Sequence, residues 1–387
     1  MKKMKSLFFG KKHLSTEDER RLIEEVVKED EERKTKLAVT EAEKEKIREA
    51  SRVRKRIEIE REIREKYLYG ERGEIESELK RREVEGEKVA AKRMEVAGKM
   101  IRKTRDADRV HESDAIRAKF GYTIVYKKVF QGPYWRVLQA KRNDSDQIMG
   151  LTIVDLMKAP GEKKENLIRI GFKITRFLAS NPHPTLLNVY DLFLVDTEYY
   201  LFHEMMETYL EKLMRHGPVA SELRASIWGW ELADGITYLH SHGIAHRNIS
   251  PKTVWMNKSL QVKLGNFSYS TVFWDEVNKK KIPVTRIQKK EEDFRPPEES
   301  ESGRMYDAAK ADVWMWASTL VYTLTKKFPP KSGFVDLKDP HIATLSHDAT
   351  SLLASALQTD SSKRPSASSI LHNVWFKPFL SNPSAKD

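Results

Sequence analysis

The chain contains no cysteine in its 387 residues. Disulfide bonds and zinc sites built from thiolates are therefore excluded, and the composition suits a reducing compartment. The sequence also lacks any run of about eighteen apolar residues, and the short apolar stretch Leu7-Phe8-Phe9 stands between lysines, so neither a transmembrane segment nor a signal peptide is predicted. We expect a soluble protein of the cytoplasm.

Proline is missing from the first part of the chain, where Pro133 is the first of fifteen. More than half of residues 1–119 are Lys, Arg, Asp or Glu, and many of the others favour helix, so this segment is predicted to form a charged helical arm. Ser15 or Thr16, followed by acidic residues, marks a helix start. The apolar positions do not sustain a heptad repeat, which favours a solvated, coiled-coil-like helix over a stable coiled coil.

Three glycines weaken the predicted arm near its end. Because each glycine inside a helix costs about 1 kcal/mol relative to alanine, Gly70, Gly73 and Gly86 predict a break or hinge within residues 69–87. A further basic helix is predicted from Lys88 to about Arg109. It leads into a folded domain that we expect to begin at residue 120.

The net charge of +12 arises from 70 basic and 58 acidic residues. Because the two signs are mixed along the chain, most of the long-range field cancels, which argues against a nucleic acid as the partner. The sequence has no zinc-finger, homeodomain or RNA-recognition pattern, and no metal site is expected.

Catalytic residues are missing from a stretch that otherwise has a well-defined motif. His246-Arg247-Asn248-Ile249-Ser250-Pro251-Lys252-Thr253 is followed by Asn266-Phe267-Ser268. This pattern resembles the H-R-D-L-K-x-x-N and D-F-G motifs of protein kinases, in which the first Asp orients the substrate hydroxyl while the Asn and the second Asp hold Mg²⁺. Those roles fall on Asn248, Thr253 and Asn266. Since amides and hydroxyls replace the carboxylates and amide of the family, we expect phosphoryl transfer to be crippled.

The preceding region resembles the small lobe of a kinase. Residues 120–154 alternate apolar and polar side chains as twisted antiparallel strands do. Residues 130–137 stand in the place of the phosphate-covering G-x-G-x-x-G-x-V, and only Gly132 and Val137 match, while Trp135 brings a large ring. His203 falls at the gatekeeper position before the hinge, where we expect it to be a packed side chain. Gly132, Val137 and His203 are thus vestigial nucleotide-cleft positions.

The family's central ion pair is also missing. Thr152 stands where the phosphate-pairing lysine of V-A-I-K belongs, and the best register puts Gly171 at the position of its glutamate partner on the following helix. Losing both ends together leaves neither charge unpaired.

Residues that hold the kinase fold together are retained. His246 and Phe267 are packing residues by resemblance, Pro296-Pro297-Glu298 stands in the place of A-P-E, and Asp312-Val313-Trp314 and Arg364-Pro365-Ser366 match D-x-W and R-P-[ST]. The resemblance implies that Glu298 pairs with Arg364 and that Asp312 braces the backbone of the catalytic loop. Structural residues are kept while catalytic residues are lost, which random decay would not produce.

The predicted fold class is α+β, a two-lobed protein-kinase-like fold preceded by the arm. The kinase-like domain covers 120–377, with a small, mostly antiparallel β N-lobe at 120–203, a hinge at 204–210 and a mostly helical C-lobe at 211–377. A tail, 378–387, follows. Lys158-Ala159-Pro160 and residues 167–188 resemble the testis-specific serine/threonine kinases of the calcium/calmodulin-kinase-like group.

The leading hypothesis is a catalytically inactive scaffold or regulator, a pseudokinase, that binds an unknown protein partner and no cofactor. One alternative is an atypical serine/threonine kinase with weak activity, which would need ATP and Mg²⁺. The other rests on the arm: stretches such as Glu32–Ala38 and Ile63–Tyr67 resemble the helices of complexins (synaphins), so residues 15–70 would bind a SNARE bundle or another coiled coil.

Overall fold

The computed structural model describes residues 72–110, 116–117, 120–158, 162–275, 278–285, 293–299, 305–333 and 339–376. The chain divides into two compact units, Met1–Gly86 and Glu87–Asp387. The predicted helix start at Ser15, the complexin-like stretches and the tail lie outside the described residues.

Helix α3 (Arg72–Lys103) is continuous through Gly73, Gly86 and Gly98. The prediction of a break within residues 69–87 is therefore wrong over its described part, and the helix ends at Lys103 rather than near Arg109. A single glycine costs only about 1 kcal/mol, which the Ala, Glu, Lys and Arg residues around it can offset.

The second half of α3 belongs to the folded unit. Ala97 and Ile101 are buried in the largest apolar cluster of the protein, and Met94 packs against it. The compact unit begins at Glu87, whereas the sequence placed the start of the folded domain at 120.

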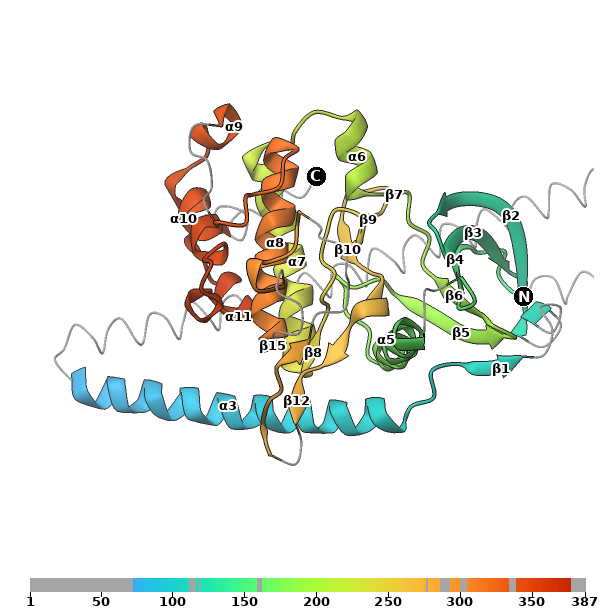
Figure 1. The fold of residues 1–387 in the computed structure, drawn as a ribbon, viewed down its shortest axis with the longest axis horizontal. Coiled ribbons are helices and arrows are strands. Elements are labelled where there is room, and N and C mark those ends of the chain that lie inside the picture. Colours follow the sequence, from blue (N-terminus) through green and yellow to red (C-terminus); the bar gives the residue numbers. More distant parts are fainter. Residues whose placement is uncertain are drawn as a thin grey trace, which may run out of the picture. The chain divides into compact units, whose positions relative to one another are not determined.

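The N-lobe is built on a six-stranded sheet with the order β1-β5-β6-β4-β3-β2. β1 pairs with β5 in parallel and the other pairings are antiparallel. Helix α5 packs on the sheet through Ile168 and Phe172 (Figure 1). The strands and helix are β1 (Asp108–Val110), β2 (Tyr122–Gln131), β3 (Trp135–Arg142), β4 (Ile148–Asp155), α5 (Glu162–Ser180), β5 (Val189–Val195) and β6 (Glu198–His203).

The C-lobe is mostly helical, as the sequence predicts, and it also contains short paired strands. Its helices are α6 (Leu210–His216), α7 (Glu222–Ser241), α8 (Ala308–Thr325), α9 (Pro340–Ala343), α10 (His347–Ala356) and α11 (Ala367–Ile370). Its strands are β7 (Thr208–Tyr209), β8 (Ile244–Ala245), β9 (Val254–Met256), β10 (Val262–Leu264), β11 (Thr271–Val272), β12 (Trp274–Asp275), β13 (Lys280–Lys281), β14 (Val284–Thr285) and β15 (Met305–Tyr306). Short 3₁₀ turns lie at η1 (Phe267–Tyr269), η2 (Pro297–Glu299), η3 (Ser361–Lys363) and η4 (Val374–Phe376).

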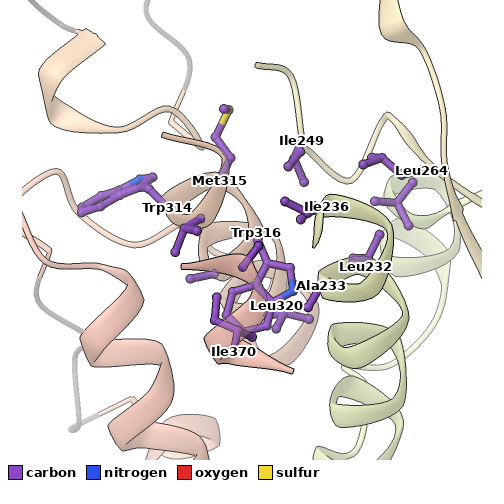
Figure 2. Close-up of a cluster of buried hydrophobic side chains, with 14 of the residues drawn as sticks. Leu232, Ala233, Ile236, Ile249, Leu264, Trp314, Met315, Trp316, Leu320 and Ile370 are labelled. Atoms are coloured by element: carbon purple, nitrogen blue, oxygen red, sulfur yellow. The ribbon is translucent and has the colours of Figure 1, made fainter. Parts of the chain in front are cut away.

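The core of the C-lobe lies between α7 and α8. Figure 2 shows Trp316 and Leu320 of α8 directed at Ala233 and Ile236 of α7. The indole of Trp316 is fully buried and donates a hydrogen bond to the carbonyl of Gly229 at 2.9 Å. The fold is therefore a two-lobed α+β arrangement. In the described part of the chain, no helix is long and apolar enough to cross a bilayer.

Candidate functional site

The loop that carries Asn248 is anchored to α8. The fully buried carboxylate of Asp312 accepts hydrogen bonds from the backbone N–H of His246 at 2.8 Å and of Arg247 at 2.7 Å. The ring of His240 lies 3.0 Å from the same carboxylate. Arg247 has a positive φ of 62°, a conformation that a side chain rarely adopts unless its surroundings hold it there. Asp312 thus fixes the backbone of the whole loop.

Asn248 is nearly buried and faces a cation. Its side-chain oxygen accepts a hydrogen bond from Arg295 at 3.4 Å. The guanidinium of Arg295 is itself buried, forms an ion pair with Glu299 at 2.8 Å and donates to the carbonyl of Arg247 at 3.4 Å. An arginine therefore covers the loop position at which an attacking hydroxyl would have to be oriented. Sequence reasoning missed Arg295 and Glu299, which stand beside a recognised motif without being part of it.

Thr253 holds the turn of the same loop. Its buried hydroxyl oxygen lies 2.7 Å from the carbonyl of Asn248 and 3.0 Å from that of Ser250, and it accepts a hydrogen bond from the Ser250 N–H at 3.0 Å. The hydroxyl is thus engaged in local backbone contacts.

Asn266 keeps the backbone of the metal-binding turn without its carboxylate. Its φ of 63° and ψ of 68° are left-handed, a conformation that asparagine adopts more readily than most residues. The preceding carbonyl, that of Gly265, accepts a hydrogen bond from His246 Nε2 at 3.0 Å, and the His246 ring lies edge-on to Phe267 at 5.3 Å. Burial lowers the pKa of His246, which fits a neutral ring that donates from one nitrogen and accepts the Asn248 N–H with the other.

Thr152 and Gly171 do not interact with each other as the ends of a pair would. The Thr152 hydroxyl lies 3.0 Å from His203 Nε2. Gly171 instead sits against the backbone of the Asn266–Ser268 turn, where an added Cβ would lie 2.4 Å from the Phe267 carbonyl oxygen and 2.7 Å from Ser268 Cα. The missing side chain at 171 lets α5 approach the turn directly.

Replacing a glycine inside a helix by alanine usually stabilises a protein, but the close approach of α5 to the turn predicts the opposite for Gly171. Gly171→Ala is expected to lower the free energy of unfolding by about 1–3 kcal/mol, because backbone atoms would have to move. Gly86→Ala in α3 is the matched control: nothing lies within 4 Å of its added Cβ, so it should increase helix content. Urea unfolding and far-UV circular dichroism measure both effects. A Gly171→Ala protein as stable as the parent would contradict the close packing of α5.

His203 is the last residue of β6, and its side chain is buried. Its ring lies over Gly150, where an added Cβ would come within 2.2 Å of the imidazole. Nδ1 donates to the carbonyl of Glu204 at 2.8 Å, and Nε2 accepts from Thr152. Burial lowers the pKa of His203 to about 4. The sequence marked His203 as a packed residue, but the part of Gly150 in making room for it was missed.

The neutral His203 predicts a pH dependence. Its side chain takes up a proton near pH 6.5 in the unfolded chain and near pH 4 in the folded one, so the unfolded state binds more protons between these values. As pH falls through that window, the parent should lose about 1.4 kcal/mol of stability per pH unit relative to His203→Gln, in which all other titrating groups are shared. Urea unfolding of both proteins at several pH values measures this difference. Parallel curves would rule out a ring held neutral.

We call the space between the two lobes the interlobe cleft. The indole rings of Trp135 and Trp255 occupy part of it. An added Cβ on Gly132 would lie 2.2 Å from the Trp135 ring, so this glycine makes room for the indole. Val137 from the N-lobe sheet and Trp255 from β9 belong to one buried apolar cluster with Leu187 and Met206. Of the interlobe cleft there remains a cavity of about 60 Å³, lined by Tyr134, Trp135, Val137, Thr152, Val154, Phe172, Thr175, Leu187, Val189, Leu201, Lys252, Trp255, Asn266, Phe267 and Ser268. The contribution of Trp255 was missed from the sequence.

Comparison with known proteins shows to which family this architecture belongs. Residues 123–376 match the protein kinase domain. The chain belongs to the protein kinase family. Human dual specificity mitogen-activated protein kinase kinase 7 is 26% identical over 241 residues, which make up 58% of this chain and 56% of that protein. The chain therefore spans little more than half of that relative.

Two further relatives of this protein kinase domain are Aurora enzymes. The Aurora kinase of Saccharomyces cerevisiae is 26% identical over 277 residues, 66% of this chain and 70% of that protein. The serine/threonine-protein kinase Aurora-2 of Arabidopsis thaliana is 24% identical over 261 residues, 64% of this chain and 88% of that protein.

A buried ion pair joins Glu298 in η2 to Arg364, which lies between η3 and α11. Arg364 is fully buried and binds both oxygens of Glu298, at 2.6 and 2.7 Å. The guanidinium also donates to the carbonyls of Gln358 and Lys310 and lies 5.0 Å from the Trp314 ring. This pair joins the segment before α8 to the C-terminal helices.

Proposed function

We propose that this member of the protein kinase family is a catalytically inactive scaffold, a pseudokinase that acts by binding a protein partner. The observation that carries the proposal is that the interlobe cleft is filled by the protein's own side chains. Ligand pockets usually enclose about 300–1,000 Å³, whereas the cavity left here is about 60 Å³. Trp135 of the N-lobe and Trp255 of the C-lobe both line what is left of it.

The chemistry of the lining also fails to fit Mg-ATP. A triphosphate requires cations. Among the described residues that line the cavity, Lys252 is the only charged one, and it is largely exposed and lies 3.9 Å from Glu211. Thr152, Asn266 and Ser268 offer hydroxyls and an amide, which are weaker ligands for Mg²⁺ than carboxylates. Within the described ranges, no three acidic or histidine side chains gather as a metal site would need.

The scaffold part of the proposal is supported by what is kept. Asp312 and the Glu298–Arg364 pair hold the loop and the C-lobe, although no catalytic chemistry depends on them here. A surface for a partner remains on the C-lobe, where Lys280 and Lys281 of β13 are exposed. The identity of the partner, the kinship with testis-specific kinases and the location in the cytoplasm stay predictions.

An atypical active kinase is the second candidate, because the relatives named above are kinases. It would require the interlobe cleft to open and Lys252 or another cation to replace the missing lysine. The two candidates make opposite predictions about nucleotide binding.

The deciding experiment measures the unfolding temperature of the full chain with and without Mg-ATP at a few millimolar, beside an active kinase as positive control. A ligand at about 100 times its dissociation constant stabilises by about 2.7 kcal/mol, which shifts the transition by several degrees. We expect no shift, and no transfer of radiolabelled phosphate to a protein substrate. A shift, together with transfer that Asn266→Ala abolishes, would refute the scaffold proposal and establish the atypical kinase.

A further inference from the structure

Residues 87–110, which we call the N-terminal brace, contact both lobes. In the C-lobe, Ala97 and Ile101 of α3 are 2% and 3% exposed within the main apolar cluster. Met94 lies beside Gly243, where an added Cβ would be 3.3 Å from the Met94 Cβ. In the N-lobe, β1 extends the sheet by pairing with Phe193–Val195 of β5 (Figure 1).

The link between α3 and β1 is fixed by Asp106. Its nearly buried carboxylate accepts hydrogen bonds from the Tyr199 hydroxyl, from Arg169 at 3.1 Å and from the backbone N–H of Ala107 at 3.0 Å. Burial alone would raise the pKa of Asp106, but the Tyr199 hydrogen bond, the charge of Arg109 and the Arg169 hydrogen bond outweigh it, so the pKa lies below its usual value. Asp106 is therefore a buried carboxylate that stays ionised.

A second aspartate, in β1, also forms an ion pair with an arginine of α5. Asp108 accepts a hydrogen bond from Arg176 at 2.8 Å. Asp106 lies in the bend just before β1 and Asp108 is the first residue of that strand, while Arg169 and Arg176, seven residues apart on α5, lie on one face of the helix. The segment before and within β1 is thus held to α5 at two points, by the contacts of Asp106 with Arg169 and of Asp108 with Arg176.

These contacts lie on the helix that the kinase family holds by an ion pair inside the cleft. That internal pair is missing here, since Thr152 and Gly171 replace its two ends. We propose that the N-terminal brace takes over this role and fixes α5 from outside, while its docked helix ties α5 to the C-lobe. The position of α5 then depends on residues that precede the kinase fold, and releasing the brace loosens α5 without touching the cleft.

Hydrogen–deuterium exchange of the full chain tests the brace through a charge swap. Asp108 and Arg176 are the more exposed of the two pairs, so the single variants Asp108→Arg and Arg176→Asp should fold. Each is expected to speed exchange of α5 peptides by about tenfold, since local opening of α5 becomes easier, while peptides from α7 stay unchanged. The double variant, Asp108→Arg with Arg176→Asp, restores the pair with reversed signs and should return α5 to the parent rate.

Asp144→Arg is the matched control, because Asp144 forms a comparably exposed pair with Arg142 on the N-lobe. It should leave the exchange of α5 unchanged. The proposal would be overturned if α5 exchanged at the parent rate in both single variants, or if the swap failed to reverse the acceleration. The result is independent of nucleotide binding, so it stands or falls separately from the proposed function.

Discussion

Glu298→Ala is expected to lower the free energy of unfolding by about 3–5 kcal/mol. Arg364 is fully buried, and both of its terminal nitrogens donate to Glu298, at 2.6 and 2.7 Å. Removing the carboxylate leaves a guanidinium that is away from water, beside the backbone carbonyls of Gln358 and Lys310 and the Trp314 ring. An uncompensated buried charge is more costly than the loss of the pair itself.

Two variants make the test specific. Asp144→Ala removes the partner of Arg142 in an exposed pair, and it should change stability by less than about 1 kcal/mol. Replacing both Glu298 and Arg364 by methionine removes the charges together, so it should recover much of the loss. Urea unfolding compares the proteins. A cost below about 1 kcal/mol for Glu298→Ala would mean that Arg364 reaches water.

Much of the kinase fold could be predicted because its motifs mark fixed points of the backbone. The Asp312 carboxylate can reach the His246 and Arg247 N–H groups only if α8 and the loop lie as they do, so a D-x-W at the right distance from H-R identifies both elements. Helix α7 (Glu222–Ser241) has apolar residues three and four positions apart, such as Ile227, Trp230 and Ala233, a spacing that is visible in the sequence alone.

The N-terminal brace could not be predicted from the same kind of pattern. Met94, Ala97 and Ile101 face inward, but α3 carries other apolar residues that are exposed, such as Val89 and Val96, so the sequence does not distinguish a docked helix from a solvated one. β1 has only three residues, and the partners of Asp106 and Asp108 on α5 lie more than 60 positions away. Contacts of that range leave no periodicity in the sequence.

At the site, the sequence predicted which chemical groups are absent but not what fills their space. Gly150 and Gly171 are ordinary glycines in a sequence. Their roles appear only when the His203 ring is found over the first and the Phe267 carbonyl against the second. Packing between residues so far apart follows from the tertiary fold, because each void is shaped by several strands at once.

Trp255→Ala is expected to lower the free energy of unfolding by about 3–5 kcal/mol, which is the usual cost of truncating a buried aromatic side chain. Trp255 is 6% exposed and shares a buried cluster with Val137 of the N-lobe, so its indole connects the two lobes across the interlobe cleft. Trp230→Ala on the half-buried face of α7 is the control and should cost less. If Trp255→Ala cost no more than this control, the interlobe cleft would be open and a nucleotide could enter it.

Chemical rescue separates a filled cleft from a general loss of packing. Indole has the shape of the deleted side chain, so at millimolar concentration it should bind the Trp255→Ala protein and raise its unfolding temperature. It should leave the parent unchanged, because the space is taken, and also Trp230→Ala, whose deleted ring is only partly buried and does not line the cavity. Rescue confined to Trp255→Ala would mean that the Trp255 side chain itself occupies the interlobe cleft. Equal effects of indole on all three proteins would show that Trp255 fills no separate space.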